Sequence, residues 1–247
     1  MSTWLDPVRV ALDRRAEAVT FFFRDDDAGW EDDKLYHLLD LPLSSEIPIA
    51  LAAIPMAIGS RLAAVLRSLV TAGAPVVSVH QHGFAHVNHE TEGRKSEFGA
   101  SRSRDLQRQD LTNGRRRLED SIGVALPPLF TPPWNRCTRD TAECLAEVGV
   151  CILSRDSSAE PFGLHSLHEL PVSLDWTGRR GVRRGPIAWG ETIAHAIASA
   201  SPVGVMLHHA AMTTGDRSML RDLFDVLSDH PRATVRQMTD IASCARR

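Results

Sequence analysis

The sequence predicts an α/β protein, a distorted (β/α) barrel of about seven parallel strands. Apolar, β-rich runs alternate with helical patterns along the whole chain. These runs are apolar almost without interruption, as expected of a parallel sheet that is buried on both faces. Polar clusters follow several of them, where a barrel carries its functional residues. A length of 247 residues is ordinary for one barrel, so residues 1–247 are expected to form a single domain.

The expected elements follow in order along the chain. Strands are indicated by apolar runs bounded by turn residues, at 18–25, 47–55, 74–80, 127–132, 150–155, 169–176 and 203–209. Helices are indicated by apolar residues at helical spacing, at 32–41, 60–73, 103–123, 138–149, 190–200 and 217–229. A closing strand and helix are expected within 233–245. An open doubly wound sheet is the alternative, although no GxGxxG follows the first strand.

Capping residues mark the two clearest helices. Ser60 is suited to begin the helix 60–73, and Gly73 is suited to end it. Thr138 and Gly149 have the same roles at the two ends of the helix 138–149.

Composition and charge argue against several classes of protein. The apolar fraction of 43% and the charged fraction of 24% are those of a globular protein with a proper core. A net charge of −3 argues against a nucleic-acid binder, and we expect no nucleic-acid partner. No run approaches the roughly eighteen apolar residues of a membrane span. The N-terminal residues lack the pattern of a secretion signal, which predicts a cytoplasmic protein.

Four cysteines are present and form no CxxC pair: Cys137, Cys144, Cys151 and Cys244. We expect them to be small buried hydrophobic residues, because disulfides are uncommon in the cytoplasm.

Polar residues cluster at the ends of five predicted strands. They are Asp25, Asp26 and Asp27; His80, His82 and His86; Pro132, Pro133, Trp134 and Asn135; Asp175 and Trp176; and His208 and His209. In a barrel the carboxyl ends of the strands meet at one face, so these clusters are expected to share a site.

The histidines and aspartates predict a metal centre. The HxxxH spacing of His82 and His86 places both imidazoles on one face of a helical turn. The three consecutive aspartates would repel one another in a partly buried site unless a cation offset their charge. Two histidines and one carboxylate leave positions open for water and substrate, as in catalytic metal sites.

Five motifs, FRDDDAG, HGFAH, TPPW, LDW and MLHH, occur in this order within residues 21–209. Together they resemble the motifs of the polysaccharide deacetylases, carbohydrate esterase family 4. The resemblance implies a metal-dependent, distorted (β/α) barrel that removes an N-acetyl group from an amino sugar or a sugar-containing precursor. It also implies one divalent metal ion, for which zinc is the first choice.

The resemblance assigns the metal ligands to Asp27, His82 and His86. It matches Asp26 to the general base, because the first motif of the family has two adjacent aspartates before a small residue. A shift of one residue would instead select Asp25 and Asp26.

The remaining roles also come from the resemblance. Trp134 matches the aromatic residue whose backbone N–H stabilises the oxyanion. His208 matches the general acid, with His209 as a rival for that role. Asp175 belongs to the fourth motif and is a candidate for substrate or transition-state contact.

The sequence departs from the family pattern at three positions. Thr131 stands where the family often has an arginine that orients the base. Val172 stands where it has an aspartate, and Thr177 follows the LDW motif where a basic residue is usual. These departures leave a degenerate, non-catalytic metal-binding homologue as an alternative.

Several other residues are candidates for the site. Asn88 and Trp30 are candidate substrate contacts, with Trp30 and Trp134 as walls of a sugar site. His80 shares a face with His82 by strand alternation and is a candidate to support it. His89 is expected to be exposed.

The expected partner is a small-molecule or glycan substrate. Four arginines lie in GRRGVRRG, residues 178–185, which is either a solvated loop or a clamp for phosphate on a nucleotide- or lipid-linked sugar. The sequence leaves the oligomeric state open.

Two further functions compete with the deacetylase. One is a metal-dependent amidohydrolase that acts on a non-sugar amide with the same barrel. The other is a non-haem Fe(II) oxygenase, since two histidines and one carboxylate also form that site. Such oxygenases usually have β-sandwich-type folds, which disfavours this alternative here.

Overall fold

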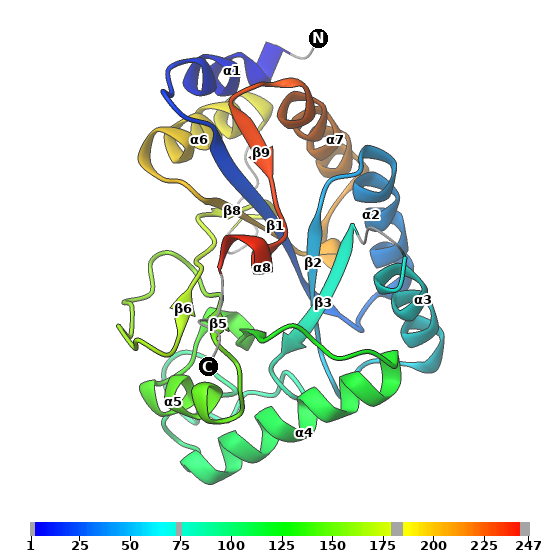
Figure 1. Cartoon of the computed structure of the whole chain (residues 1–247), viewed down its shortest axis with the longest axis vertical. Coiled ribbons are helices and arrows are strands. Elements are labelled where there is room, and N and C mark those ends of the chain that lie inside the picture. The colour runs from blue at the N-terminus through cyan, green and yellow to red at the C-terminus, as the bar shows by residue number, and fades with distance from the viewer. Residues whose placement is uncertain (1–2, 73–75, 179–184, 243–247) are drawn as a thin grey trace.

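A computed structural model describes residues 3–72, 76–178 and 185–242. Its centre is a curved sheet in which all strand pairs are parallel, with the order β6-β5-β4-β3-β2-β1-β8-β7 and β9 beside β1. Helices surround the sheet (Figure 1). The predicted (β/α) barrel is therefore confirmed.

The strands are β1 (Val19–Ala28), β2 (Ile49–Ala53), β3 (Val77–His82), β4 (Leu129–Thr131), β5 (Ile152–Leu153), β6 (His168–Glu169), β7 (Leu174–Asp175), β8 (Val203–Leu207) and β9 (Ala233–Val235). The helices are α1 (Asp6–Asp13), α2 (Asp32–Ser45), α3 (Ser60–Val70), α4 (Arg104–Ile122), α5 (Arg139–Glu147), α6 (Pro186–Ser199), α7 (Thr214–Asp229) and α8 (Met238–Ile241). Short 3-10 turns include Pro133–Asn135 and His209–Ala211.

The segment 168–175 joins the two ends of the sheet. Its first part pairs with β5, where the backbone N–H of Leu170 donates to the Leu153 carbonyl at 2.9 Å. Its last part pairs with β8, where the N–H of Ser173 donates to the Gly204 carbonyl at 2.9 Å. The single strand expected at 169–176 is wrong, because the chain changes partner there. Taken as one, β6 and β7 leave seven strand positions in this order, and β9 pairs with β1 in addition.

Side chains of β1 alternate between two apolar layers. Phe21 and Phe23 belong to the large cluster between the sheet and its helices. Phe22 belongs to a smaller cluster with side chains from β2, β4, β5 and β8, which fills the barrel interior. By the same period of two, Asp25 follows Phe23 outward and Arg24 follows Phe22 inward. The strand thus sends consecutive polar residues to opposite sides of the sheet.

The ends of the helices differ in part from expectation. Thr138 caps α5 as predicted, since its hydroxyl accepts a hydrogen bond from the N–H of Thr141. Helix α3 begins at Ser60, but its N-cap is Gly59 and its C-cap is Thr71. Helix α1, which the sequence analysis did not anticipate, buries Val8 and packs against α6.

The cysteines also differ from expectation. Cys144 is buried with a free thiol, and Cys137 is free as well. Burial raises the pKa of the Cys137 thiol to about 12 and keeps it protonated. Cys151 is disulfide-bonded, so the expectation of a reduced thiol is wrong for this residue.

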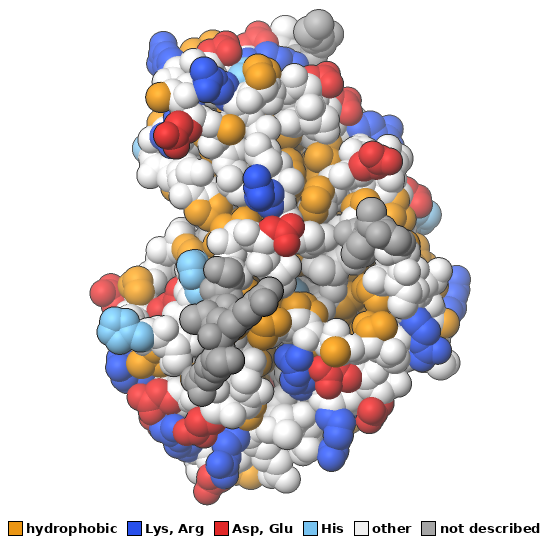
Figure 2. All heavy atoms as spheres, in the orientation of Figure 1, with side chains coloured by type: hydrophobic (Ala, Val, Ile, Leu, Met, Phe, Trp, Pro, Cys, Tyr) orange, Lys and Arg blue, Asp and Glu red, His pale blue; other side chains and the backbone are white. Residues whose placement is uncertain are grey.

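The surface and the helices agree with the composition. Basic and acidic side chains are interspersed over the face shown in Figure 2, in keeping with a net charge of −3. Within the described residues, we find no helix whose length and apolar character would let it span a membrane.

Candidate metal centre

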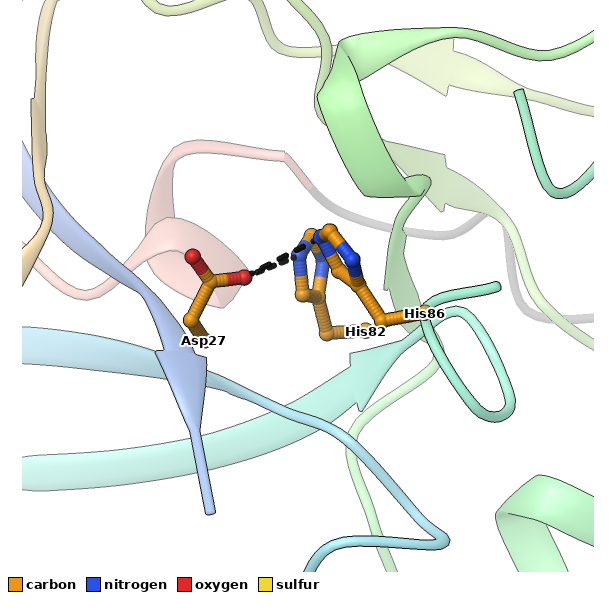
Figure 3. A group of neighbouring side chains, drawn as sticks. All are labelled: Asp27, His82 and His86. Atoms are coloured by element: carbon orange, nitrogen blue, oxygen red, sulfur yellow. Dashed lines mark ion pairs between the residues drawn. The ribbon is translucent and has the colours of Figure 1, made fainter. Parts of the chain in front are cut away.

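Asp27, His82 and His86 converge at the carboxyl ends of β1 and β3. The Nε2 atoms of His82 and His86 each lie 3.2 Å from Oδ1 of Asp27 (Figure 3). The three candidate ligand atoms lie within 4.8 Å of one another. Two imidazole nitrogens and one carboxylate oxygen are the donor set of a catalytic zinc-type site.

The hydrogen bonds of the cluster suit a divalent cation. Nδ1 of His82 lies 3.0 Å from the Thr131 carbonyl oxygen, so it carries the proton and leaves the Nε2 lone pair facing Asp27. Oδ1 of Asp27 is buried and has no hydrogen-bond partner among the described residues. Burial opposes the charge of Asp27, but the two imidazoles hold its pKa well below the usual range. A divalent cation placed among these three facing atoms would satisfy all of them, and the donor set fits a metal ion.

The loop that carries His86 is not helical, so the helical turn expected from the HxxxH spacing is wrong. Gly83 has a φ of 60° and His86 has a φ of 57°, and both lie in the left-handed region. These two residues turn the chain back after β3, and the turn brings His86 beside His82, with ring centroids 5.2 Å apart. The rings of Trp30 and Trp134 flank His86 at centroid distances of 4.7 Å and 4.4 Å.

Asp26 points into the barrel and pairs with Arg24. Nε of Arg24 donates to Oδ1 of Asp26 at 2.7 Å, and Nη2 donates to Oδ2 at 2.9 Å. Both side chains are buried, with 0% and 3% of their surface exposed. A bidentate pair of this kind fixes the orientation of the carboxylate as well as compensating its charge.

The Arg24 guanidinium is in turn held by other parts of the barrel. Nη1 donates to the Ser154 hydroxyl at 2.7 Å, and Nη2 donates to Oδ1 of Asn135 at 2.7 Å. Ser154 donates to the Leu170 carbonyl at 2.7 Å. The basic partner of Asp26 is therefore an arginine on β1, whereas the motif resemblance implied an arginine at the position of Thr131.

Asp25 lies on the other side of the sheet and binds His209. Its Oδ1 accepts the backbone N–H of His209 at 2.9 Å, and its Oδ2 lies 2.6 Å from Nδ1. Nε2 of His209 lies 2.7 Å from the Trp30 carbonyl oxygen. Burial alone would lower the pKa of His209, but the Asp25 carboxylate and the Trp30 carbonyl raise it to about 9. Both ring nitrogens of His209 are thus engaged.

His208 lies at the end of β8 and is partly exposed. Its Nδ1 lies 3.5 Å from the hydroxyl of Thr177, which donates to Oδ1 of Asp175 at 3.2 Å. Thr177 thus stands between the imidazole and the carboxylate. Trp176 lies between Asp175 and Thr177 in the sequence, but its side chain is buried and stacks on Trp189 at a centroid distance of 4.8 Å.

The other predicted candidates differ in their surroundings. His80 is fully buried, and its Nε2 lies 2.8 Å from the Thr131 hydroxyl. Burial lowers the pKa of His80 well below its ordinary value, so the ring is neutral. The Asn88 side chain binds the backbone of Glu90 and Ser96 and shapes the loop. His89 is exposed, as predicted. The arginines of 178–185 fall outside the described residues.

Sequence reasoning missed Arg24 and Glu97. Glu97 is 1% exposed and its carboxylate accepts the backbone N–H groups of Phe84 and Ala85 at 3.0 and 2.8 Å. A charged residue in the middle of an apolar strand was the available signal for Arg24. Glu97 carries no such signal, because its partners are backbone groups distant in sequence.

Solved structures with the same fold include carbohydrate esterases. A candidate polysaccharide deacetylase from Mycobacterium smegmatis is 20% identical over 92% of this chain and 90% of that chain, with a TM-score of 0.70. A family 4 acetyl xylan esterase from Clostridium thermocellum, in complex with cobalt, is 12% identical over 90% and 89%, with a TM-score of 0.57.

A family 4 pseudoenzyme from Bacillus anthracis is 14% identical over 92% of this chain and 66% of that chain, with a TM-score of 0.57. No protein-family model matches the sequence, and a search of curated proteins found no match. The chain therefore has the fold of the family 4 carbohydrate esterases, as its motifs predicted.

Proposed function

We propose that this protein is a metal-dependent hydrolase that removes an N-acetyl group from an amino sugar or a sugar-containing precursor. The observation that carries the proposal is the cluster of Asp27, His82 and His86, whose ligand atoms lie within 4.8 Å of one another. The motif resemblance and the shared fold point to the same chemistry.

The metal would be held by Asp27, His82 and His86, and zinc is the proposed ion. When bound, a divalent ion of this kind lowers the pKa of a water ligand and polarises a substrate carbonyl. The Thr131 carbonyl sets the tautomer of His82 through Nδ1 and so keeps Nε2 free for the ion.

Asp26 and His208 are the proposed acid–base pair. Asp26 accepts a proton as water attacks the amide carbon, and Arg24 holds its carboxylate in place. His208 donates a proton to the departing amine, which is otherwise a poor leaving group. The backbone N–H of Trp134 is proposed to stabilise negative charge on the carbonyl oxygen. His209 is a weaker candidate for the acid, because both of its ring nitrogens have partners.

The departures from the family pattern have counterparts in this chain. Arg24 offsets the loss of an arginine at Thr131. The hydroxyl of Thr177 connects His208 with Asp175, so a carboxylate still orders the proposed acid without an aspartate at Val172. These contacts favour an active enzyme over a degenerate metal-binding homologue.

The substrate class is open to a direct test. Purified protein loaded with zinc should release acetate from N-acetylated amino sugars. O-acetylated sugars and small linear or cyclic amides form the comparison panel, since an acetyl xylan esterase shares the fold and a non-sugar amidohydrolase is the competing function. Release from the small amides alone would replace the proposal with that competing function, and no release from any substrate would favour the non-catalytic alternative.

Phosphate-linked sugars belong in the same panel, because the arginines of 178–185 are proposed to bind phosphate. Equal activity with and without the phosphate would count against this clamp. The cytoplasmic location stays a prediction, and the disulfide of Cys151 argues against a reducing compartment.

A further inference from the structure

Glu97 is a buried acid in the segment that connects β3 with α4. Its carboxylate accepts the backbone N–H groups of Phe84 at 3.0 Å, Ala85 at 2.8 Å and Val87 at 3.5 Å. The residue is 1% exposed, and within the described part of the chain no basic side chain forms an ion pair with it. Three backbone dipoles therefore stabilise its charge.

Glu97 is itself anchored to an apolar cluster that lies between β4 and the helices α4 and α5. The next residue, Phe98, is fully buried in a cluster with side chains of α4, β4 and α5. The Phe98 carbonyl accepts the N–H of Thr138 at 3.1 Å, and Phe98 forms a β-bridge with Cys137. The carboxylate thus projects from a fixed part of the backbone toward the turn that follows β3.

The turn held by Glu97 contains a ligand of the candidate metal centre. The three N–H groups that it binds flank His86, whose φ of 57° is unfavourable for a residue with a side chain. Gly83 packs directly on the carboxylate, because a Cβ at this position would lie 2.1 Å from Oε2 of Glu97. Without this acceptor, the N–H groups of Phe84, Ala85 and Val87 would lose their partner and the turn would relax.

We propose that Glu97 is a positioning residue that sets the affinity of the Asp27, His82 and His86 site for a divalent metal ion. Within the described residues its carboxylate bonds to none of the three candidate ligand side chains, and it acts through the backbone on either side of His86. The inference rests on the metal centre of the proposed function, but it makes no use of the deacetylase reaction.

The test compares the affinity for Zn²⁺ of wild type, Glu97→Gln and Glu90→Gln, measured by competition with a chromophoric chelator. Glu97→Gln keeps the size of the side chain but replaces one acceptor oxygen with a donor NH2 group. Glu90→Gln is the matched control, because Glu90 lies in the same connecting segment and its carboxylate accepts hydrogen bonds from the backbone N–H and the hydroxyl of Ser101.

We expect Glu97→Gln to weaken Zn²⁺ binding by about 10- to 100-fold, the usual effect of losing a residue that orients a ligand. Glu90→Gln should stay within about twofold of wild type. If Glu97→Gln does not fold, Glu97→Asp is measured instead; it keeps the charge but is too short to reach all three N–H groups, so its affinity should fall as well.

Thermal unfolding of each metal-free protein separates a positioning role from a purely structural one. A lower melting temperature for Glu97→Gln with unchanged Zn²⁺ affinity would overturn the inference, and so would an equal loss of affinity in Glu90→Gln. If the proposed metal centre itself is wrong, the wild type will bind no Zn²⁺, and this result is distinct from a failure of the role of Glu97. Normal Zn²⁺ binding without acetate release would refute the deacetylase and leave the role of Glu97 intact.

Discussion

The three consecutive aspartates of β1 have three different partners. Asp25 binds His209 outside the sheet, Asp26 binds Arg24 inside it, and Asp27 faces His82 and His86. The sequence argument that all three repel one another around a single cation is therefore too simple. Strand alternation separates Asp25 from Asp26. The pairing of β1 with β2 shifts register between Asp25 and Ala28, and within this bulge Asp27 has a φ of 70°, which redirects the third carboxylate.

Replacing Asp26 by Asn should abolish most of the activity and preserve the metal. Loss of a general base lowers rates by about 10²- to 10⁴-fold. The variant should also unfold more easily, since removing one partner of a buried ion pair costs about 3–5 kcal/mol. Acetate release, elemental analysis and urea unfolding measure the three effects; full activity would refute the role of Asp26. Asp27→Asn is the contrasting variant, in which metal content itself should fall.

The Asp25–His209 pair predicts how stability depends on pH. The folded-state pKa of His209, about 9, lies above its ordinary value of 6.5. The pair therefore stabilises the fold fully below about pH 6.5, and this contribution disappears as the pH rises through about 9. Urea unfolding should show that His209→Gln is more destabilised, relative to wild type, at about pH 6 than at about pH 10. Equal destabilisation at both values would contradict this assignment.

At the scale of the element, the segment that connects β3 with α4 contains two glycines, Gly83 and Gly93, which both have a positive φ but differ in their surroundings. A Cβ on Gly83 would lie 2.5 Å from Pro133 as well as against Glu97, whereas a Cβ on Gly93 meets no atom within 4 Å. Gly83→Ala should therefore disrupt the turn and lose metal binding. Gly93→Ala should cost only the backbone strain, about 1 kcal/mol.

Metal titration and urea unfolding of the two alanine variants test this prediction. Because both glycines have positive φ, 60° and 74°, the comparison isolates the steric contact from the backbone preference. Equal behaviour of the two variants would show that the close packing of Gly83 is unimportant.

Most elements could be predicted from the sequence because their hydrophobic patterns are local. The strand expected at 203–209 appears as β8, and the helix expected at 217–229 appears within α7. The strand expected at 169–176 could not be divided correctly, because its partners are residues 152–155 and 204–206, and pairing depends on how the barrel closes. The candidate ligands were predictable as residue types, and Arg24 had a signal in its charge within an apolar strand, but no local pattern indicates the backbone groups that Glu97 binds.

At the scale of the whole molecule, metal binding should stabilise the fold. The candidate ligands come from β1, from β3 and from the turn after β3, so an ion links parts of the chain that separate on unfolding. Zn²⁺ at about 100 times its dissociation constant should add about 2.7 kcal/mol to the free energy of unfolding. Thermal unfolding with added Zn²⁺ and with a chelator measures this shift.

His82→Ala is the control for that measurement, because it removes a candidate ligand that is 1% exposed and should lose the response to Zn²⁺. A variant that still responds like wild type would place the ion elsewhere. No response in wild type, even after metal is supplied, would remove the metal centre from the proposed function.

The segment 168–175 has a consequence for how copies of this protein behave toward one another. An unpaired strand at the rim of a sheet is a template on which another chain can add, which leads to aggregation. Here the segment 168–175 pairs first with β5 and then with β8, so the backbone groups at both ends of the sheet have partners within the chain. The Ser154 hydroxyl donates to the Leu170 carbonyl and helps to hold the segment 168–175 in place. Replacing Ser154 is therefore expected to promote self-association before it abolishes folding.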